Sequence, residues 1–377
     1  MKVVLAFDSW KESVSAVEAC AAATGGLARL GLRLEVIQCP LSDGGEGFAQ
    51  AMALAGCGTI RTVQVTGPLF EPVAADIILL DGGRCAVVET AQACGLERVP
   101  MARRSPGKTT TFGLGELLSQ AVSAGAREIV VGLGGSATND AGIGMLSALG
   151  WKFLDRNGHP VHPVGESLVR IERIEPGVSL KDVRIIAACD VRNPLFGPNG
   201  AAHVYAPQKG ATPEEVIALD QGLRHFAEVC AVSLGRDCAA WPGAGAAGGL
   251  GFALLACLGA EFRAGAELAI QLSGLAGHLN GADLCLTGEG RTDYQTACGK
   301  LPAAVAACCR EAGVPCVCLS GALGERWQEC YNAGFAAIFS VLQRPVTLAE
   351  AVERTPAALA DAAEAVARLV MASTRGC

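Results

Sequence analysis

The stretch that most constrains the fold runs from Ile129 to Gly144. Its first three residues are apolar and β-branched, which is typical of a buried strand. The chain then turns through Gly132, Gly134 and Gly135 and resumes a helical pattern near Gly144. Glycine lets a backbone approach a ligand closely, and the free N–H groups at the start of a helix attract anions. The stretch therefore predicts a strand–turn–helix unit that either binds an anion or is a tight turn that binds nothing.

Length and composition favour a globular protein of two domains. The chain has 377 residues, of which 51% are hydrophobic, and this is enough for a large core. The net charge of −7 argues against nucleic acid or an anionic membrane surface as a partner. Met1 leads directly into a short apolar run that ends at Asp8, which is unlike a secretory leader. We therefore expect a cytoplasmic protein.

The 17 cysteines are odd in number and include no CxxC pair, which does not resemble a disulfide framework. The five histidines do not combine with them at the spacing of zinc sites. We expect reduced, buried thiols that act as small apolar side chains.

The order of the predicted strands and helices suggests that one domain is inserted into another. Strands and helices alternate at both ends of the chain, whereas short strands between turn signals follow one another from Thr62 to Glu89. We expect an α/β fold in which residues 1–64 and 281–377 form a discontinuous, doubly wound domain of Rossmann or flavodoxin type. Residues 65–280 would form an inserted mixed-sheet α/β domain that carries the 129–144 stretch. Ligands commonly bind between such domains, so we expect the active site in the cleft.

Two helix starts are marked by capping signals. Thr212 precedes Pro213, Glu214 and Glu215, which together form the strongest start signal in the chain. Ser9 or Ser13 is expected to cap the alanine-rich helix that follows the first strand.

Acidic side chains, most of them beside a base or a flexible backbone, follow several predicted strands. These are Asp8 with Lys11 and Glu12, Asp43 with Glu46, Asp140, Asp190 with Arg192, and Glu289 with Arg291 and Asp293. In open α/β sheets, ligands gather outside the carboxyl ends of the strands. Carboxylates with Lys, Arg and glycine turns suit Mg²⁺ and phosphate, although a helix cap or an ion pair explains any one acid alone. Five such clusters together favour a phosphotransferase.

Other chemistries fit less well. No dinucleotide fingerprint follows the first strand, because Asp8 and Ser9 occupy that turn, which argues against an NAD-dependent oxidoreductase. Residues 106–109 resemble the end of a P-loop, but Ala102 stands where its first glycine is required. A nucleotide- or anion-binding regulatory protein without turnover remains the alternative from another class.

Five motifs resemble the bacterial glycerate kinase family. They read Asp8-Ser9-x-Lys11-Glu12-Ser13, Asp43-Gly44-Gly45-Glu46-Gly47, Thr109-Thr110-Thr111-x-Gly113-x-Gly115-Glu116, Gly132-x-Gly134-Gly135-Ser136-Ala137-Thr138-Asn139-Asp140 and Gly288-Glu289-Gly290-Arg291-x-Asp293-x-Gln295-Thr296. Further matches at 190–195, 207–210 and 243–251 extend the resemblance over nearly the whole chain. It implies two α/β domains around a cleft and ATP-dependent phosphorylation of D-glycerate, and we favour the 2-hydroxyl over the 3-hydroxyl.

Roles for individual residues follow as hypotheses. For the substrate we expect Asp8 and Ser9, with Lys11, Arg291 or Lys300 on the carboxylate through charge-assisted bonds. For catalysis the candidates are Lys11, Arg291 and Asp190. Asp190 would be the base for the attacking hydroxyl, because a buried strand end holds it firmly.

The ATP phosphates and Mg²⁺ are assigned to other side chains. Phosphate is expected at Gly134, Gly135, Ser136, Thr138, Asn139 and Lys209, and Mg²⁺ at Asp43, Glu289 and Asp293. The expected partners are D-glycerate and ATP, with neither nucleic acid nor a membrane, and the protein would be a monomer or a homodimer. Trp10 and Tyr294 depart from the family's usual residues, so a kinase of another small hydroxy acid stays open.

Overall fold

The fold is described from a computed structural model of the chain. The structure describes residues 1–10, 13–43, 47–56, 58–178 and 180–374. The chain divides into two compact units, each built from separate segments. Unit 1 comprises Met1–Asp43, Gln50–Cys57 and Gly265–Cys377, and unit 2 comprises Gly44–Ala49 and Gly58–Ala264.

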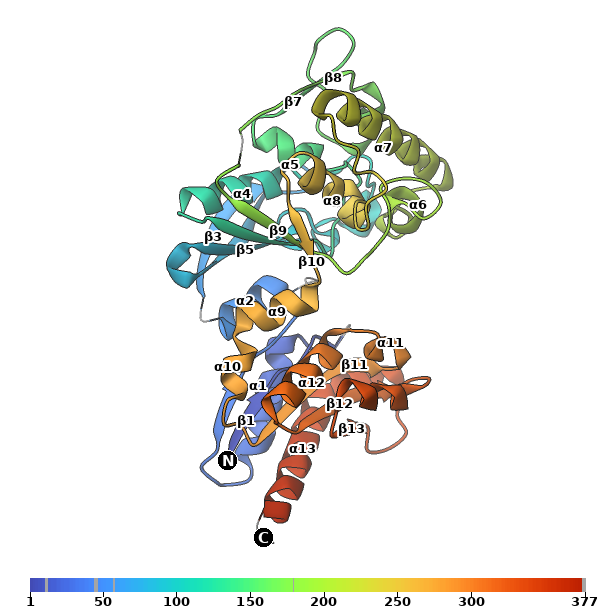
Figure 1. Cartoon of the computed structure of the whole chain (residues 1–377). Coiled ribbons are helices and arrows are strands. Elements are labelled where there is room, and N and C mark those ends of the chain that lie inside the picture. Colours follow the sequence, from blue (N-terminus) through green and yellow to red (C-terminus); the bar gives the residue numbers. More distant parts are fainter. Residues whose placement is uncertain (11–12, 44–46, 57, 179, 375–377) are drawn as a thin grey trace. The chain divides into compact units, whose positions relative to one another are not determined.

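Unit 1 is built on a five-stranded sheet in the order β2-β1-β11-β12-β13 (Figure 1). Its strands are β1 (Lys2–Leu5), β2 (Glu35–Gln38), β11 (Leu284–Thr292), β12 (Cys316–Leu323) and β13 (Ala337–Ser340). All four neighbouring pairs are parallel. Counted along the chain, the order is 2-1-3-4-5, the flavodoxin-like arrangement in which ligands bind where the strand order reverses. That point lies between the carboxyl ends of β1 and β11.

Helices cover both faces of this sheet. On one face α1 and α13 pack together over Val3, Leu5 and Leu286. The other face is covered by α12, which contacts β11, β12, α9 and α10. The helices of this part of the chain are α1 (Ala16–Ala28), α2 (Phe48–Ala55), α9 (Gly265–Ser273), α10 (Leu275–Leu279), α11 (Tyr294–Ala297), α12 (Leu301–Ala312) and α13 (Leu348–Thr374), with the 3₁₀ turn η6 (Trp327–Ala333).

Unit 2 contains a six-stranded mixed sheet in the order β10-β9-β6-β5-β4-β3. Its strands are β3 (Thr59–Thr66), β4 (Pro72–Leu80), β5 (Cys85–Glu89), β6 (Glu128–Gly132), β9 (Arg184–Ala188) and β10 (Glu261–Arg263). The β3–β4 and β4–β5 pairs are antiparallel, and the other three pairs are parallel. A separate antiparallel pair joins β7 (Lys152–Leu154) to β8 (Arg173–Glu175).

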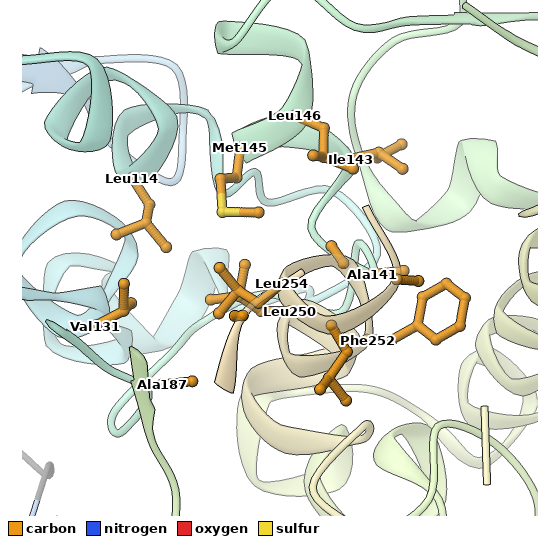
Figure 2. Close-up of a cluster of buried hydrophobic side chains, with 14 of the residues drawn as sticks. Leu114, Val131, Ala141, Ile143, Met145, Leu146, Ala187, Leu250, Phe252 and Leu254 are labelled. Carbon is orange, nitrogen blue, oxygen red and sulfur yellow. The ribbon is translucent and has the colours of Figure 1, made fainter. Parts of the chain in front are cut away.

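The core of unit 2 lies between this sheet and its helices. The helices are α3 (Thr90–Cys94), α4 (Phe112–Ser123), α5 (Ile143–Ala148), α6 (Ala201–Tyr205), α7 (Pro213–Leu234) and α8 (Ala246–Ala256), with the 3₁₀ turns η1 (Asp81–Gly83), η2 (Leu96–Arg98), η3 (Met101–Arg103), η4 (Gly165–Arg170) and η5 (Pro207–Lys209). Figure 2 shows Val131 of β6 and Ala187 of β9 near Leu114 of α4 and Leu254 of α8. Helix α8 is the buried helix that follows the glycine loop near residue 243.

The α/β class with a parallel sheet at the chain ends and a mixed sheet in the middle is confirmed. The boundaries lie elsewhere than the predicted 64/65 and 280/281. Strand β3 pairs with β4 from Thr59 to Thr66, which places it in unit 2. Helices α9 and α10 pack on α12, which places residues 265–279 in unit 1. Both boundaries depend on strand pairing and helix packing. The local sequence pattern does not show which elements pair or pack together.

Both predicted caps can be compared with the structure. Thr212 caps α7 as expected, because its hydroxyl accepts from the Glu215 N–H at 3.3 Å. Helix α1 is capped by Ser15 rather than by Ser9 or Ser13, and the Glu18 carboxylate accepts from the Ser15 N–H at 2.8 Å. The helix therefore begins later than the first serines suggest.

Among the described residues, no helix combines the length and apolar character needed to cross a membrane.

Candidate active site

The loop between β6 and α5 carries most of the predicted phosphate ligands. Gly134 is half-buried, Gly135 is exposed at φ +71°, and Ser136 is buried. Backbone bonds hold this turn against the segment after α3, since the Leu96 N–H donates to the Gly135 carbonyl at 2.8 Å. The Ala137 N–H donates in the same way to the Cys94 carbonyl at 2.8 Å. The turn is therefore fixed in place before any ligand arrives.

Lys209 lies directly behind this turn. Its Nζ donates to Ser136 Oγ at 2.7 Å and to the Thr138 carbonyl at 2.8 Å. The side chain is buried, and this burial lowers the pKa of Lys209 from 10.5 to about 8, while the nearby carboxyl group of Asp140 opposes the change. The structure thus brings together Ser136 and Lys209, which lie 73 positions apart in the sequence. A buried ammonium behind a turn of small residues is a suitable element of an anion site.

The start of α5 is occupied by the protein's own carboxylate. Asp140 is fully buried and accepts from Thr111 N at 2.9 Å, Thr111 Oγ1 at 2.8 Å, Gly142 N at 3.1 Å and Gly144 N at 3.3 Å. Burial raises the pKa of Asp140, and these donors oppose the change. The helix start of the strand–turn–helix stretch is therefore occupied by the carboxyl group of Asp140. This leaves Gly134 and Gly135 as the part of the turn that is accessible.

Thr138 and Asn139 are fully buried rather than displayed on the turn. Their backbone packs against two glycines: a Cβ at Gly248 would lie 2.0 Å from the Thr138 carbonyl oxygen, and one at Gly165 would lie 2.5 Å from the Asn139 carbonyl oxygen. Within the described part of the chain, Thr138 Oγ1 and both amide atoms of Asn139 have no hydrogen-bond partner. Buried polar atoms of this kind are usually satisfied by water or a ligand.

In unit 1, Glu289 is the centre of a second polar cluster, close to the carboxyl end of β11. Its Oε1 accepts from Thr296 Oγ1 at 2.5 Å and from Thr292 Oγ1 at 3.2 Å, and its Oε2 lies 3.7 Å from Lys300 Nζ. Burial raises the pKa of Glu289, and Thr296, Lys300 and Thr292 oppose that change. Asp293 is also buried, and its charge adds to the raised pKa of Glu289. The cluster therefore combines two buried acids with an accessible lysine.

Asp293 has a structural and an electrostatic partner. Its Oδ1 accepts from the Gln295 N–H at 3.0 Å and so caps α11. Its Oδ2 lies 3.4 Å from Nε of Arg291, whose side chain is largely exposed. Both acids of this cluster therefore have a cationic side chain beside one oxygen.

Asp8 lies next to this cluster because β1 and β11 are neighbours. The Asp8 N–H donates to the Gly288 carbonyl at 3.1 Å, and the Ser9 N–H donates to Asp8 Oδ1 at 2.7 Å. The backbone of Asp8 thus lies beside Gly288, which precedes Glu289 in the chain, at the point where the strand order reverses. Lys11 lies outside the described residues.

Two further predicted site residues lie in exposed positions. Asp43 of unit 1 is exposed. Asp190 of unit 2 follows the buried strand β9, and its own side chain is exposed. The burial ends with Ala188, the last residue of the strand.

The predicted Mg²⁺ ligands do not form a compact triad of acids. In the part of the chain that the structure describes, only Cys285, Cys309 and Cys316 form a group of three potential donors whose ligand atoms lie within 4.8 Å. These cysteines are buried, as expected, but their convergence was missed. Thr292 and Thr296 were also missed as partners of Glu289. Sequence spacing contains no signal for either, except that Thr296 closes the 288–296 motif.

Comparisons with known proteins cover nearly the whole chain. The model of the glycerate kinase family matches residues 3–371. A protein of Escherichia coli strain K12 named glycerate 2-kinase is 43% identical over 356 residues, which is 93% of each chain. A glycerate kinase of Bacillus subtilis strain 168 is 41% identical over 378 residues, covering 100% of this chain and 98% of its own. The crystal structure of a putative glycerate kinase 2 from Salmonella typhimurium LT2 superimposes with a TM-score of 0.87 at 41% identity, covering 100% of this chain and 99% of the other.

Proposed function

This chain belongs to the glycerate kinase family and is a phosphotransferase, and we propose that it transfers the γ-phosphate of ATP to the 2-hydroxyl of D-glycerate. The observation that carries the proposal is the similarity, over nearly the whole length of both chains, to a protein named glycerate 2-kinase. The two polar clusters are chemically consistent with it. One offers an anion site around a buried lysine, and the other offers acids and cations where a doubly wound sheet binds ligands.

In the proposed mechanism, the substrate is held by the cluster of unit 1. D-Glycerate carries a carboxylate and two hydroxyls. Lys11, Arg291 and Lys300 are the side chains that we assign to the carboxylate, through charge-assisted hydrogen bonds. The Asp8 carboxylate accepts hydrogen bonds from the hydroxyls of the substrate, and the Ser9 hydroxyl donates to them. Positioning of this kind supplies much of the rate in phosphoryl transfer, because little covalent chemistry is required of the protein.

The phosphates of ATP are assigned to the turn of unit 2. Gly134 and Gly135 let the backbone approach the phosphate oxygens, and Ser136 adds a hydroxyl beside its Lys209 partner. The ammonium of Lys209 supplies positive charge behind this turn. Thr138 and Asn139 act from behind the turn, since their side chains are fully buried.

The donor set of unit 1 suits Mg²⁺. This ion is usually held by one or two carboxylates together with substrate phosphates, so it does not require the compact triad that is missing here. The oxygens assigned to the ion are Oε2 of Glu289 and Oδ2 of Asp293, each of which lies beside a cationic side chain. The carboxylate of Asp43 is a further candidate ligand. Bound Mg²⁺ would neutralise charge on the transferring phosphoryl group. Asp190 remains our proposed base for the attacking hydroxyl.

Phosphorus NMR of the purified protein with Mg-ATP and D-glycerate tests this function. A new phosphomonoester signal with ADP is expected, and its proton coupling distinguishes 2-phosphoglycerate from 3-phosphoglycerate. Unchanged ATP in a folded sample would remove the assignment. Turnover with another hydroxy acid alone would keep the kinase and change its substrate, whereas ATP binding without consumption would favour a regulatory protein.

A further inference from the structure

We propose that Thr292 and Thr296 are positioning residues that hold Glu289 ready to bind a divalent cation, and that Lys300 pairs with the ligand oxygen in the cation-free protein. The inference rests on the proposed function, because a phosphotransferase of this kind uses a cation with its nucleotide. It goes further by assigning the ligand oxygen and the side chains that select it.

Two hydroxyls occupy the same oxygen of Glu289. Thr296 Oγ1 and Thr292 Oγ1 lie 2.5 Å and 3.2 Å from Oε1, and both threonines are fully buried. A hydroxyl has one proton to donate, and for both threonines Glu289 is the acceptor. The rotation of the carboxylate is thereby restricted, and Oε2 is the oxygen that remains for a ligand.

The threonines are themselves held in place. The Thr292 N–H donates to Ser320 Oγ at 3.1 Å, which ties the end of β11 to β12. Thr296 Oγ1 accepts from the Asp293 N–H at 3.3 Å while it donates to Glu289. One hydroxyl therefore links the Glu289 carboxylate to the backbone of Asp293. Hydrogen bonds behind a ligating carboxylate commonly fix its orientation, and their loss typically costs about 10–100-fold in metal affinity.

Lys300 has the features of a counter-charge that can be displaced. Its Nζ lies 3.7 Å from Glu289 Oε2, which is an ion-pair distance rather than a hydrogen bond. Its side chain is 40% exposed and has a flexible four-carbon stem, so it can turn away at low cost. A cation at Oε2 would release Lys300 for the carboxylate of the substrate. A purely structural ion pair would not need two buried hydroxyls on the opposite oxygen.

The test is the affinity of the full chain for Mn²⁺, measured by electron paramagnetic resonance of the free ion without nucleotide or substrate. Mn²⁺ prefers oxygen ligands, whereas Zn²⁺ or Cd²⁺ would also occupy the buried thiols at Cys285, Cys309 and Cys316. Wild-type protein is expected to bind Mn²⁺, and Glu289→Gln is expected to weaken this most. Thr296→Val should lower the affinity about 10–100-fold, and Thr296→Ser should restore it to within about threefold because it keeps the hydroxyl.

Two more variants separate positioning from general damage. Thr287 lies in β11, the strand of Glu289, and its buried hydroxyl donates to the Ala6 carbonyl. Thr287→Val removes this hydroxyl and should leave the Mn²⁺ affinity unchanged. Lys300→Met should bind Mn²⁺ more tightly than wild type while its KM for glycerate rises. This opposite change is not expected of a residue that merely stabilises the fold.

The proposal is overturned if wild type binds no Mn²⁺, if Thr296→Val equals Thr287→Val, or if Lys300→Met gains no affinity. Lys300→Met and Thr296→Ser keep the test decisive should Thr296→Val fail to fold. The expected Mn²⁺ pattern without kinase activity would refute the proposed function alone. Glycerate phosphorylation with Mn²⁺ affinities that do not respond to Thr296 would refute this inference alone.

Discussion

Replacing Lys209 by Met should make the stability of the protein respond differently to pH. The ammonium is buried, and burial lowers its pKa to about 8 in the folded chain, against 10.5 when it is exposed. Between these values the unfolded chain binds more protons than the folded chain, so the free energy of unfolding rises with pH. At about 1.4 kcal/mol for each pH unit, the full window corresponds to about 3 kcal/mol.

At pH 7 the substitution has opposing effects. It removes a buried charge whose desolvation costs about 3 kcal/mol on the same reasoning. It also removes the bonds to Ser136 Oγ and the Thr138 carbonyl, and a buried acceptor left unpaired costs about 1–3 kcal/mol. Lys209→Met is therefore expected to lie within about 2 kcal/mol of wild type at pH 7, although its affinity for ATP falls.

The assay is urea denaturation followed by circular dichroism at several pH values from 7 to 10.5, with wild type and Lys209→Met in parallel. Taking the difference between the two proteins cancels the other titrating groups. Wild type should gain about 3 kcal/mol relative to the variant across this range. A difference that stays constant with pH would show that Lys209 is not desolvated, and the reasoning from its burial would fail.

Three further changes test other parts of the structure. Gly248→Ala should destabilise the protein by more than about 2 kcal/mol in thermal or urea unfolding, because φ is +72° and the new Cβ would lie 2.0 Å from the Thr138 carbonyl oxygen. Gly259→Ala, at φ +69° with no atom within 4 Å, should cost only about 1–2 kcal/mol, and equal losses would refute the role of the close contact. Asp190→Asn should lower kcat about 10²–10⁴-fold with little change in ATP affinity, and a near-normal rate would exclude Asp190 as the base. Cd²⁺ should bind the three thiols and produce an ultraviolet thiolate-to-metal absorption band. Cys309→Ala should abolish this band, whereas the control Cys20→Ala should keep it. A band that survives in Cys309→Ala would contradict the convergence of the three thiols.

Much of the fold follows from local patterns. Alternating strands and helices at both ends of the chain predict a parallel, doubly wound sheet, and short strands between turns predict a mixed sheet in the middle. The cap at Thr212 is equally local, because it involves residues three positions apart. Asp8 follows β1 as the pattern predicts, whereas Glu289 lies inside β11, which continues to Thr292 instead of ending at Thr287.

The partners of these side chains are beyond such patterns. Asp140 was counted among the acids that suit Mg²⁺ and phosphate, but its carboxyl group accepts from Thr111 and from the start of α5. Asp190 follows a buried strand as expected, but the burial ends at Ala188 and the side chain of Asp190 is exposed. In both cases the position along the chain was right and the surroundings were not, because these depend on segments that are distant in sequence.

The sequence by itself determined the fold class, the family and the positions of the acidic and glycine-rich turns, since these depend on local periodicity and on motifs that are contiguous in the chain. Only the tertiary structure decided that Ser136 meets Lys209, that Thr292 and Thr296 share one oxygen of Glu289, and that three thiols converge. The physical reason is that these groups come from separate elements, which only packing and strand register bring together. Cys285 and Cys316 lie opposite each other because β11 and β12 pair in one register, and a slip by one residue would turn the side chains of a strand to the other face of the sheet.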